Sequence, residues 1–161
     1  MLYNTNKIRI YYSFLHYSFV SLSMDNVQLE RSELVVAVVG SRSIHSESAA
    51  ELLATHLAQL RPALVVSGGA TGADALAAEW ARANAVPVLE LRPDYRAHGA
   101  GATHERNRRI AERADLVLLL WDGVSTGTLS TARAAARLGR PCRWLLQGPP
   151  SATPVFGGLG L

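Results

Sequence analysis

Short apolar runs alternate with alanine-rich stretches of helical periodicity along most of this chain. The runs, each containing valine or leucine, cover residues 34–39, 63–67, 87–91, 115–121 and 142–146. Helical spacing predicts helices over 46–60, 73–84, 103–113 and 128–138. Strands that are apolar throughout are typical of sheets buried on both faces. The alternation predicts an α/β fold: a Rossmann-like three-layer α/β/α arrangement with a parallel sheet of about five strands.

Glycine-bearing turns follow three of these apolar runs. They read Gly-Ser-Arg-Ser at 40–43, Ser-Gly-Gly-Ala-Thr-Gly-Ala-Asp at 67–74 and Ser-Thr-Gly-Thr at 125–128. Parallel strands joined by right-handed crossovers place all their carboxyl ends at one edge of the sheet. We therefore expect the three turns to meet there, with backbone amides at helix amino ends available to a phosphate.

The 67–74 turn is the most informative of the three. It lacks the G-x-G-x-x-G spacing of dinucleotide-binding folds and the lysine of a Walker A loop, so neither NAD binding of the usual kind nor ATP hydrolysis is predicted. Its glycines alone are also compatible with a tight turn that binds nothing. The prediction of a ligand site rests on the three turns together.

Polar side chains beside these turns complete the candidate site. Arg42 can pair with an anion in bidentate fashion, whereas Asp74 can bond ribose hydroxyls or cap a helix. The candidate ligand-binding residues are Gly40, Ser41, Arg42, Gly68, Gly69, Gly72, Asp74, Arg106, Asn107, Ser125, Gly127 and Thr128. No catalytic residue is fixed by the sequence, and the candidates are Asp74, Glu105 and Arg106.

Metal and cofactor chemistry are not predicted. The histidines at 45, 98 and 104 lack the paired spacing of metal ligands. Cys142 is the only cysteine, which excludes an internal disulfide, and its apolar surroundings predict a core thiol. Trp121 is predicted to pack in the core, with stacking on a base as the alternative.

Composition sets the domain limits and the class of partner. With 48% hydrophobic and 18% charged residues, the 161-residue chain fits one globular domain. Residues 1–31 are predicted to be a disordered extension or a start-site artefact, because the first two dozen residues hold most of the tyrosines and no alanine or glycine. Residues 32–147 form the predicted domain, and the proline- and glycine-rich 148–161 a flexible tail.

The net charge of +3 comes from dispersed arginines without a long basic run. An anionic small molecule explains this as well as nucleic acid does. The 10–22 segment is too short to span a bilayer and no cleavage site follows it, so a cytoplasmic protein without a membrane partner is predicted.

Several separated motifs together resemble the YspA/cpYpsA-related branch of the SLOG superfamily. They are Val-Val-Gly-Ser-Arg-Ser at 38–43, Ser-Gly-Gly-Ala-Thr-Gly-Ala-Asp at 67–74, Arg106-Asn107 and Ser-Thr-Gly-Thr at 125–128. The resemblance covers roughly residues 34–146. It implies a Rossmann-like fold that senses or processes a nucleotide or nucleotide-derived ligand, with a homodimer as a possible assembly.

Two related groups supply the alternative functions. LOG phosphoribohydrolases cleave an N-glycosidic bond with a glutamate in a P-G-G-x-G-T-x-x-E loop. Gly127 and Thr128 match its G-T, but Thr131 stands at the glutamate position, which argues against that reaction. DprA proteins bind single-stranded DNA, which requires a basic groove with stacking aromatics, and this sequence meets that requirement only thinly. Nucleic acid is therefore the least expected partner. N-glycosidic hydrolysis is the first alternative to binding alone.

Overall fold

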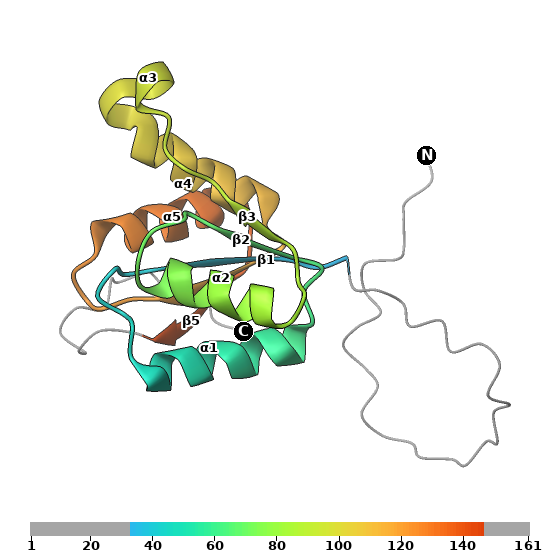
Figure 1. The fold of residues 1–161 in the computed structure, drawn as a ribbon. Helices are drawn as coiled ribbons and strands as arrows, with labels where there is room; N and C mark the ends of the chain where they lie inside the picture. Colours follow the sequence, from blue (N-terminus) through green and yellow to red (C-terminus); the bar gives the residue numbers. More distant parts are fainter. Residues whose placement is uncertain (1–32, 147–161) are drawn as a thin grey trace, which may run out of the picture. The chain divides into compact units, whose positions relative to one another are not determined.

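The computed structural model describes residues 33–146, which form five parallel strands with helices on both faces (Figure 1). The strand order is β3-β2-β1-β4-β5. The strands are β1 (Val35–Gly40), β2 (Leu64–Ser67), β3 (Val88–Glu90), β4 (Leu116–Leu120) and β5 (Cys142–Leu146). The predicted Rossmann-like α/β fold is confirmed. The extension at 1–31 and the tail at 148–161 lie outside the described residues.

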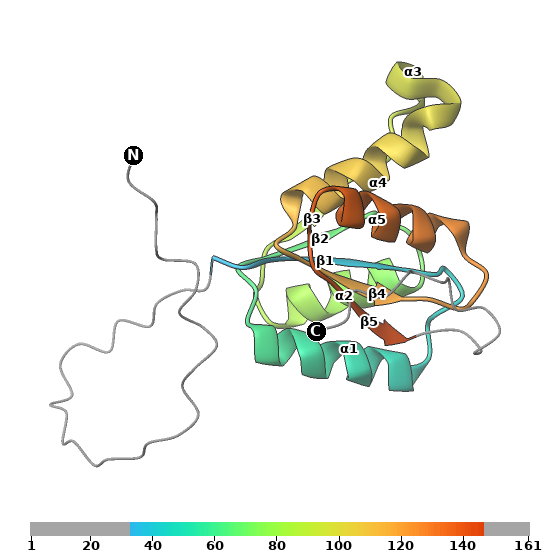
Figure 2. The same ribbon diagram turned by 180° about the vertical axis from the view of Figure 1, so that it is seen from behind.

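Two pairs of helices cover the sheet, one pair on each face (Figures 1 and 2). One pair is α1 (Glu47–Leu60) and α2 (Ala73–Ala83); the other is α4 (Ala102–Arg113) and α5 (Thr126–Arg137). Each pair closes its own hydrophobic cluster against the sheet. The result is the three-layer arrangement that the alternating sequence predicts.

The central strand β1 feeds both clusters. Val36 and Val38 pack with α1 and α2, whereas Ala37 and Val39 pack with α4 and α5. Successive side chains of a strand point to opposite faces, so a continuous apolar run is what a sheet covered on both sides requires.

Two local features differ from the predicted elements. The polar stretch after β3 contains the short helix α3 (Tyr95–His98) and the 3-10 turn η2 (Gly99–Gly101), which were not predicted. Asp94 starts α3, because its Oδ1 accepts from the amides of Arg96 and Ala97, both at 3.0 Å. Helix α5 begins two residues earlier than predicted, since Ser125 is its N-cap.

The sheet topology fixes where a ligand can enter. The chain leaves β1 toward α1 on one face and leaves β4, the neighbouring strand, toward α5 on the other face. The loops after these two strands therefore diverge, and the space between them is the usual ligand site of an open parallel sheet. Among the described residues, no helix is long and apolar enough to cross a membrane.

Candidate functional site

A pocket of about 570 Å³ opens at this switch point. Its walls come from the loop after β1, the loop after β2, the loop after β4, helix α4 and the first turn of α5. Most of the sequence-predicted residues line it: Gly40, Arg42, Asp74, Arg106, Asn107, Ser125, Gly127 and Thr128. The volume lies within the range of pockets that hold small molecules.

The amino end of α5 presents free backbone donors to this pocket. Ser125 caps the helix, and its Oγ accepts from the Thr128 amide at 3.5 Å and from the Thr128 hydroxyl at 3.2 Å. The amides of Thr126 and Gly127 have no acceptor within residues 33–146. Helix dipoles favour an anion at such an end. The first turn of α5 thus offers two free backbone donors to the pocket.

The carbonyl of Gly127 holds that first turn in place. It accepts from Asn107 Nδ2 at 3.4 Å and from Thr131 Oγ1 at 3.3 Å. Asn107 is only 3% exposed and Thr131 is fully buried. Asn107 therefore ties α4 to the amino end of α5, and the Thr131 hydroxyl is already used inside the helix.

Asp122 joins the two diverging loops. Its Oδ2 accepts from the Ser43 hydroxyl at 2.7 Å, and its Oδ1 accepts from the amides of Val124 at 3.0 Å and Ser125 at 2.8 Å. Burial opposes ionisation, but these hydrogen bonds outweigh it and hold the pKa of Asp122 well below its ordinary value. Asp122 stays ionised and fixes the pocket mouth, with Ser41 Oγ accepting from its amide at 3.1 Å.

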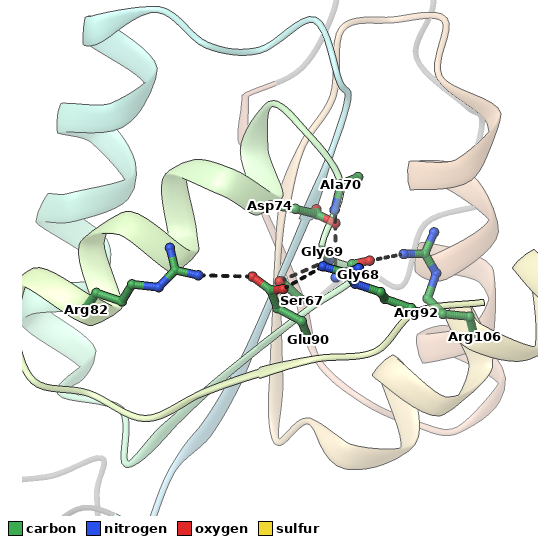
Figure 3. Close-up of polar contacts among 9 residues, drawn as sticks. All are labelled: Ser67, Gly68, Gly69, Ala70, Asp74, Arg82, Glu90, Arg92 and Arg106. Carbon is green, nitrogen blue, oxygen red and sulfur yellow. Dashed lines mark hydrogen bonds and ion pairs between the residues drawn. The ribbon is translucent and has the colours of Figure 1, made fainter. Parts of the chain in front are cut away.

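Gly68 lies between two oppositely charged side chains (Figure 3). Its amide donates to Asp74 Oδ2 at 3.0 Å, and its carbonyl accepts from Arg106 Nη1 at 2.9 Å. An added Cβ at this position would meet Arg106 Nη1 and would lie 2.8 Å from Asp74 Oδ2. A larger residue here would have to displace the Arg106 guanidinium, because both side chains lie against the Gly68 Cα.

Each of these charged side chains has one buried atom without a partner. Within the part of the chain that the structure describes, Asp74 Oδ1 and Arg106 Nε are buried and make no hydrogen bond. Both residues line the pocket, and Asp74 is only 4% exposed. Unpaired buried polar atoms are rare and costly, so they are expected where a ligand or a bound water supplies the missing contact.

Burial raises the pKa of Asp74 above its ordinary value of 3.8. The amide of Ala70, the Arg106 guanidinium and the amide of Gly68 act in the opposite direction but do not cancel the effect. Burial likewise lowers the pKa of Arg106, which Asp74 partly offsets and the nearby Arg42 reinforces. Two cations thus approach each other at the pocket.

The glycine-rich turn after β2 has a different role from the one expected. Its amides were predicted to be free for phosphate, yet those of Gly68 and Ala70 donate to Asp74, and that of Gly69 donates to Ser67 Oγ at 3.4 Å. The Asp74 carboxylate can accept from the Gly68 and Ala70 amides because Asp74 lies at the start of helix α2, directly after the glycine-rich turn.

Four predicted residues do not reach the pocket lining: Ser41, Gly68, Gly69 and Gly72. Gly72 has φ of 78°, and a Cβ there would lie 2.6 Å from the carbonyl oxygen of Arg42. Gly72 lets the loop after β2 approach the loop after β1 closely, which is a structural role.

The structure does not bring Glu105 to the pocket. Its carboxylate pairs with Arg108 on the outer side of α4, at 2.6 Å. Hydrogen bonding to Arg108 lowers the pKa of Glu105, as expected for a solvated ion pair. Of the three catalytic candidates, only Asp74 and Arg106 line the pocket.

Core packing accounts for Trp121. It is 4% exposed and packs edge-to-face against Trp144, with ring centres 6.1 Å apart. Its indole nitrogen donates to the Ser125 carbonyl at 3.0 Å.

Burial raises the pKa of the Cys142 thiol, which is half-buried on the edge strand β5. Within residues 33–146, no group of three or more metal-ligating side chains occurs.

Several lining residues escaped the sequence analysis. Ser43, Thr103, Ile110 and Thr126 all line the pocket. Ser43 belongs to a turn that was singled out, and the missed helix start at Ser125 explains Thr126. Thr103 and Ile110 could have been found from their spacing of about one turn on either side of Arg106.

Removing the charge of Asp74 should change how stability depends on pH. The folded state holds the Asp74 proton more tightly than the unfolded chain does, so this carboxyl stabilises the fold most below pH 3.8. That contribution is lost as the pH rises through the raised folded pKa. Asp74→Asn keeps an acceptor for the loop amides and cannot ionise. We therefore expect the free energy of unfolding of the variant, relative to the parent, to increase from pH 4 to pH 7.

Urea denaturation at several pH values measures this difference, and all other carboxylates cancel because both proteins carry them. If the free energies of unfolding of the parent and of Asp74→Asn follow parallel curves against pH, the burial of Asp74 does not raise its pKa.

Comparison with known proteins agrees with the α/β fold described above. Residues 34–98 match the model of the family described as "YspA, cpYpsA-related SLOG family". No curated protein matches the chain significantly. The structure of TM1055, a structural-genomics target, superposes with a TM-score of 0.53 at 25% identity, covering 68% of this chain and 72% of that one.

Two structures of DNA processing protein A (DprA) share the fold. The protein from Streptococcus pneumoniae gives a TM-score of 0.58 at 22% identity, covering 69% of this chain and 50% of that one. The structure of the Helicobacter pylori protein, which is described by its single-stranded DNA binding mode, gives a TM-score of 0.55 at 24% identity. The match covers 70% of this chain and 65% of that one. This chain thus spans only half of the first and about two thirds of the second.

The expectation that nucleic acid is the least expected partner finds no support in these comparisons, because one structural neighbour is described as binding single-stranded DNA. Residues 34–98 therefore match the YspA, cpYpsA-related SLOG family model, and the described residues share their fold with the three solved structures.

Proposed function

We propose that this chain binds a nucleotide or nucleotide-derived ligand in the switch-point pocket, with a phosphoryl group at the amino end of α5. The match of residues 34–98 to the SLOG family model supports a nucleotide-related binding or processing role. The observation that carries the proposal is the convergence of donors without an acceptor within residues 33–146: the amides of Thr126 and Gly127, the Arg42 guanidinium and Arg106 Nε.

Electrostatics favours an anion at this position. Arg42 has no ion pair within residues 33–146, and it lies near enough to Arg106 to lower the pKa of that guanidinium. The two carboxylates of the pocket, Asp74 and Asp122, already accept hydrogen bonds from loop amides. A phosphoryl group between the arginines would relieve their repulsion and accept from the helix amides.

Hydrolysis of an N-glycosidic bond is the second candidate, and Asp74 is the observation that favours it. A buried carboxyl with a raised pKa in a pocket is suited to general acid work. Thr131, at the position of the LOG glutamate, has no carboxylate and donates its hydroxyl to Gly127. A hydrolase in this chain would therefore depend on Asp74 as the proton donor to the departing base.

A thermal-shift panel tests the binding proposal directly. Purified protein is heated with AMP, GMP, CMP, UMP, ADP or NAD, and at 100 times its Kd a ligand adds about 2.7 kcal/mol of stability. We expect at least one nucleotide to raise Tm by roughly 5 °C or more. Absence of a shift across the panel, with no binding heat in calorimetry, would contradict the proposal.

The same mixtures separate binding from catalysis when they are analysed by chromatography for released base. Binding alone predicts no released base. Turnover that Asp74→Asn abolishes would establish the hydrolase instead. Retention of single-stranded dT12 that falls steeply with salt would establish the DNA-binding function described for the Helicobacter pylori protein.

A further inference from the structure

A second pocket adjoins the first along the groove between α4 and α5, which lie side by side in both views (Figures 1 and 2). Its volume is about 370 Å³. The two pockets share the lining residues Thr103, Asn107, Thr126 and Gly127. They therefore meet at the first turn of α5, where we place the phosphoryl group of the ligand.

The charges lining this second pocket have one sign. Arg133 and Arg137 line it, and no aspartate or glutamate does. Both arginines are exposed, and neither has an ion pair within residues 33–146. Like charges one turn apart on a helix repel each other. An anion in this pocket would pair with both.

The geometry of α5 brings this positive charge close to the phosphate site. Arg133 lies six residues after Gly127, which corresponds to about 9 Å along the helix axis. Helical side chains lean toward the amino end of their helix, and Arg133 and Gly127 line the same pocket. Below it, His104 Nδ1 and Ser130 Oγ are 3.0 Å apart and connect the two helices.

Gly127 leaves the passage between the two pockets open. The nearest atom to a Cβ at this position would be Ser125 Oγ at 4.0 Å, so the chain is not forced to use glycine here by its own packing. Unlike Gly68 and Gly72, which accommodate neighbouring atoms of the protein, Gly127 adjoins empty space in both pockets.

We infer that the ligand carries a second phosphoryl group, bound by Arg133 and Arg137, so that the site selects nucleoside diphosphates or pyrophosphate-bridged nucleotides over nucleoside monophosphates. This inference rests on the proposed function and specifies its ligand class. The first phosphoryl group lies at the Thr126 and Gly127 amides, and the second extends over Gly127 into the groove.

Calorimetric titration with the pairs AMP and ADP, and GMP and GDP, tests the inference. In the parent protein we expect the diphosphate of at least one pair to bind ten or more times as tightly as its monophosphate. The double variant Arg133→Gln/Arg137→Gln should remove this advantage and leave the Kd of the monophosphate within about twofold. Arg113→Gln/Arg143→Gln, which removes two exposed charges outside both pockets, should retain it.

The outcomes separate this inference from the proposed function. If the monophosphate binds and the Arg133/Arg137 variant keeps the full diphosphate advantage, the second phosphoryl site is wrong while the first stands. Equal binding of the monophosphate and the diphosphate to the parent protein would likewise show that the second phosphoryl site is wrong. If neither nucleotide binds, the second phosphoryl site and the proposed function are both wrong. If the variant weakens only the retention of single-stranded dT12, the groove binds a polynucleotide and the inference is overturned.

Discussion

Arg106→Ala is expected to weaken nucleotide binding by roughly 100-fold. Arg106 supplies a guanidinium to the pocket, and its Nε is buried without a partner within residues 33–146. Hydrogen bonds to charged groups contribute about 1.5 to 3 kcal/mol each, and the upper value corresponds to roughly 100-fold in Kd. Calorimetry with the nucleotide that gives the largest thermal shift measures the change.

The matched control is Arg108→Ala, two residues further along the same helix. Arg108 is exposed and pairs with Glu105 and Glu112 instead of lining the pocket. Its loss should leave Kd within about twofold, because exposed ion pairs contribute little. Arg106→Lys keeps the charge but not the planar fork and should recover part of the affinity. Equal losses for Arg106→Ala and Arg108→Ala would remove Arg106 from the site.

Gly40→Ala should destabilise the fold by about 3 kcal/mol, because overpacking a close contact forces the backbone apart. A Cβ at Gly40 would lie 2.5 Å from the carbonyl oxygen of Leu120 and would collide with the Cβ of Ala73. The substitution therefore separates β1 from both β4 and α2. We expect Tm to fall on the order of 10 °C in a calorimetric scan.

Gly101→Ala is the control for this effect. No atom lies within 4 Å of a Cβ at Gly101, and its φ of −80° suits any residue. Its Tm should stay within about 2 °C of the parent, since surface substitutions away from tight contacts change stability little. A similar loss at both positions would mean that the β1 end does not need the close approach seen here.

The sheet was predictable because its pattern is local. Continuous apolar runs such as Val-Val-Ala-Val-Val fill both clusters from one strand, and the glycine-bearing turns mark where three of the strands end. Gly139 has φ of 65° just after α5, the left-handed conformation that glycine favours where a helix ends. The missed start of α5 has a local cause too: Ser125, Thr126 and Thr128 are all acceptable caps, and only the structure selects Ser125.

The distribution of free amides was not predictable, because it depends on contacts that sequence spacing does not reveal. Arg106 lies 38 residues after Gly68 yet donates to its carbonyl, and Ser43 donates to Asp122 across 79 residues. In the turn with the most glycines, Asp74 accepts from the amides of Gly68 and Ala70. In the less conspicuous Ser-Thr-Gly-Thr turn, the amides of Thr126 and Gly127 have no acceptor within residues 33–146.

We propose that the anion binds at the amino end of α5 and not at that of α2. Backbone amide NMR during a titration with the tightest-binding nucleotide distinguishes these two positions. We expect the largest shifts at the amides of Thr126 and Gly127, with smaller changes at Gly68 and Ala70. Largest shifts at Thr71, Gly72 and Ala73, with Thr126 and Gly127 unmoved, would contradict it.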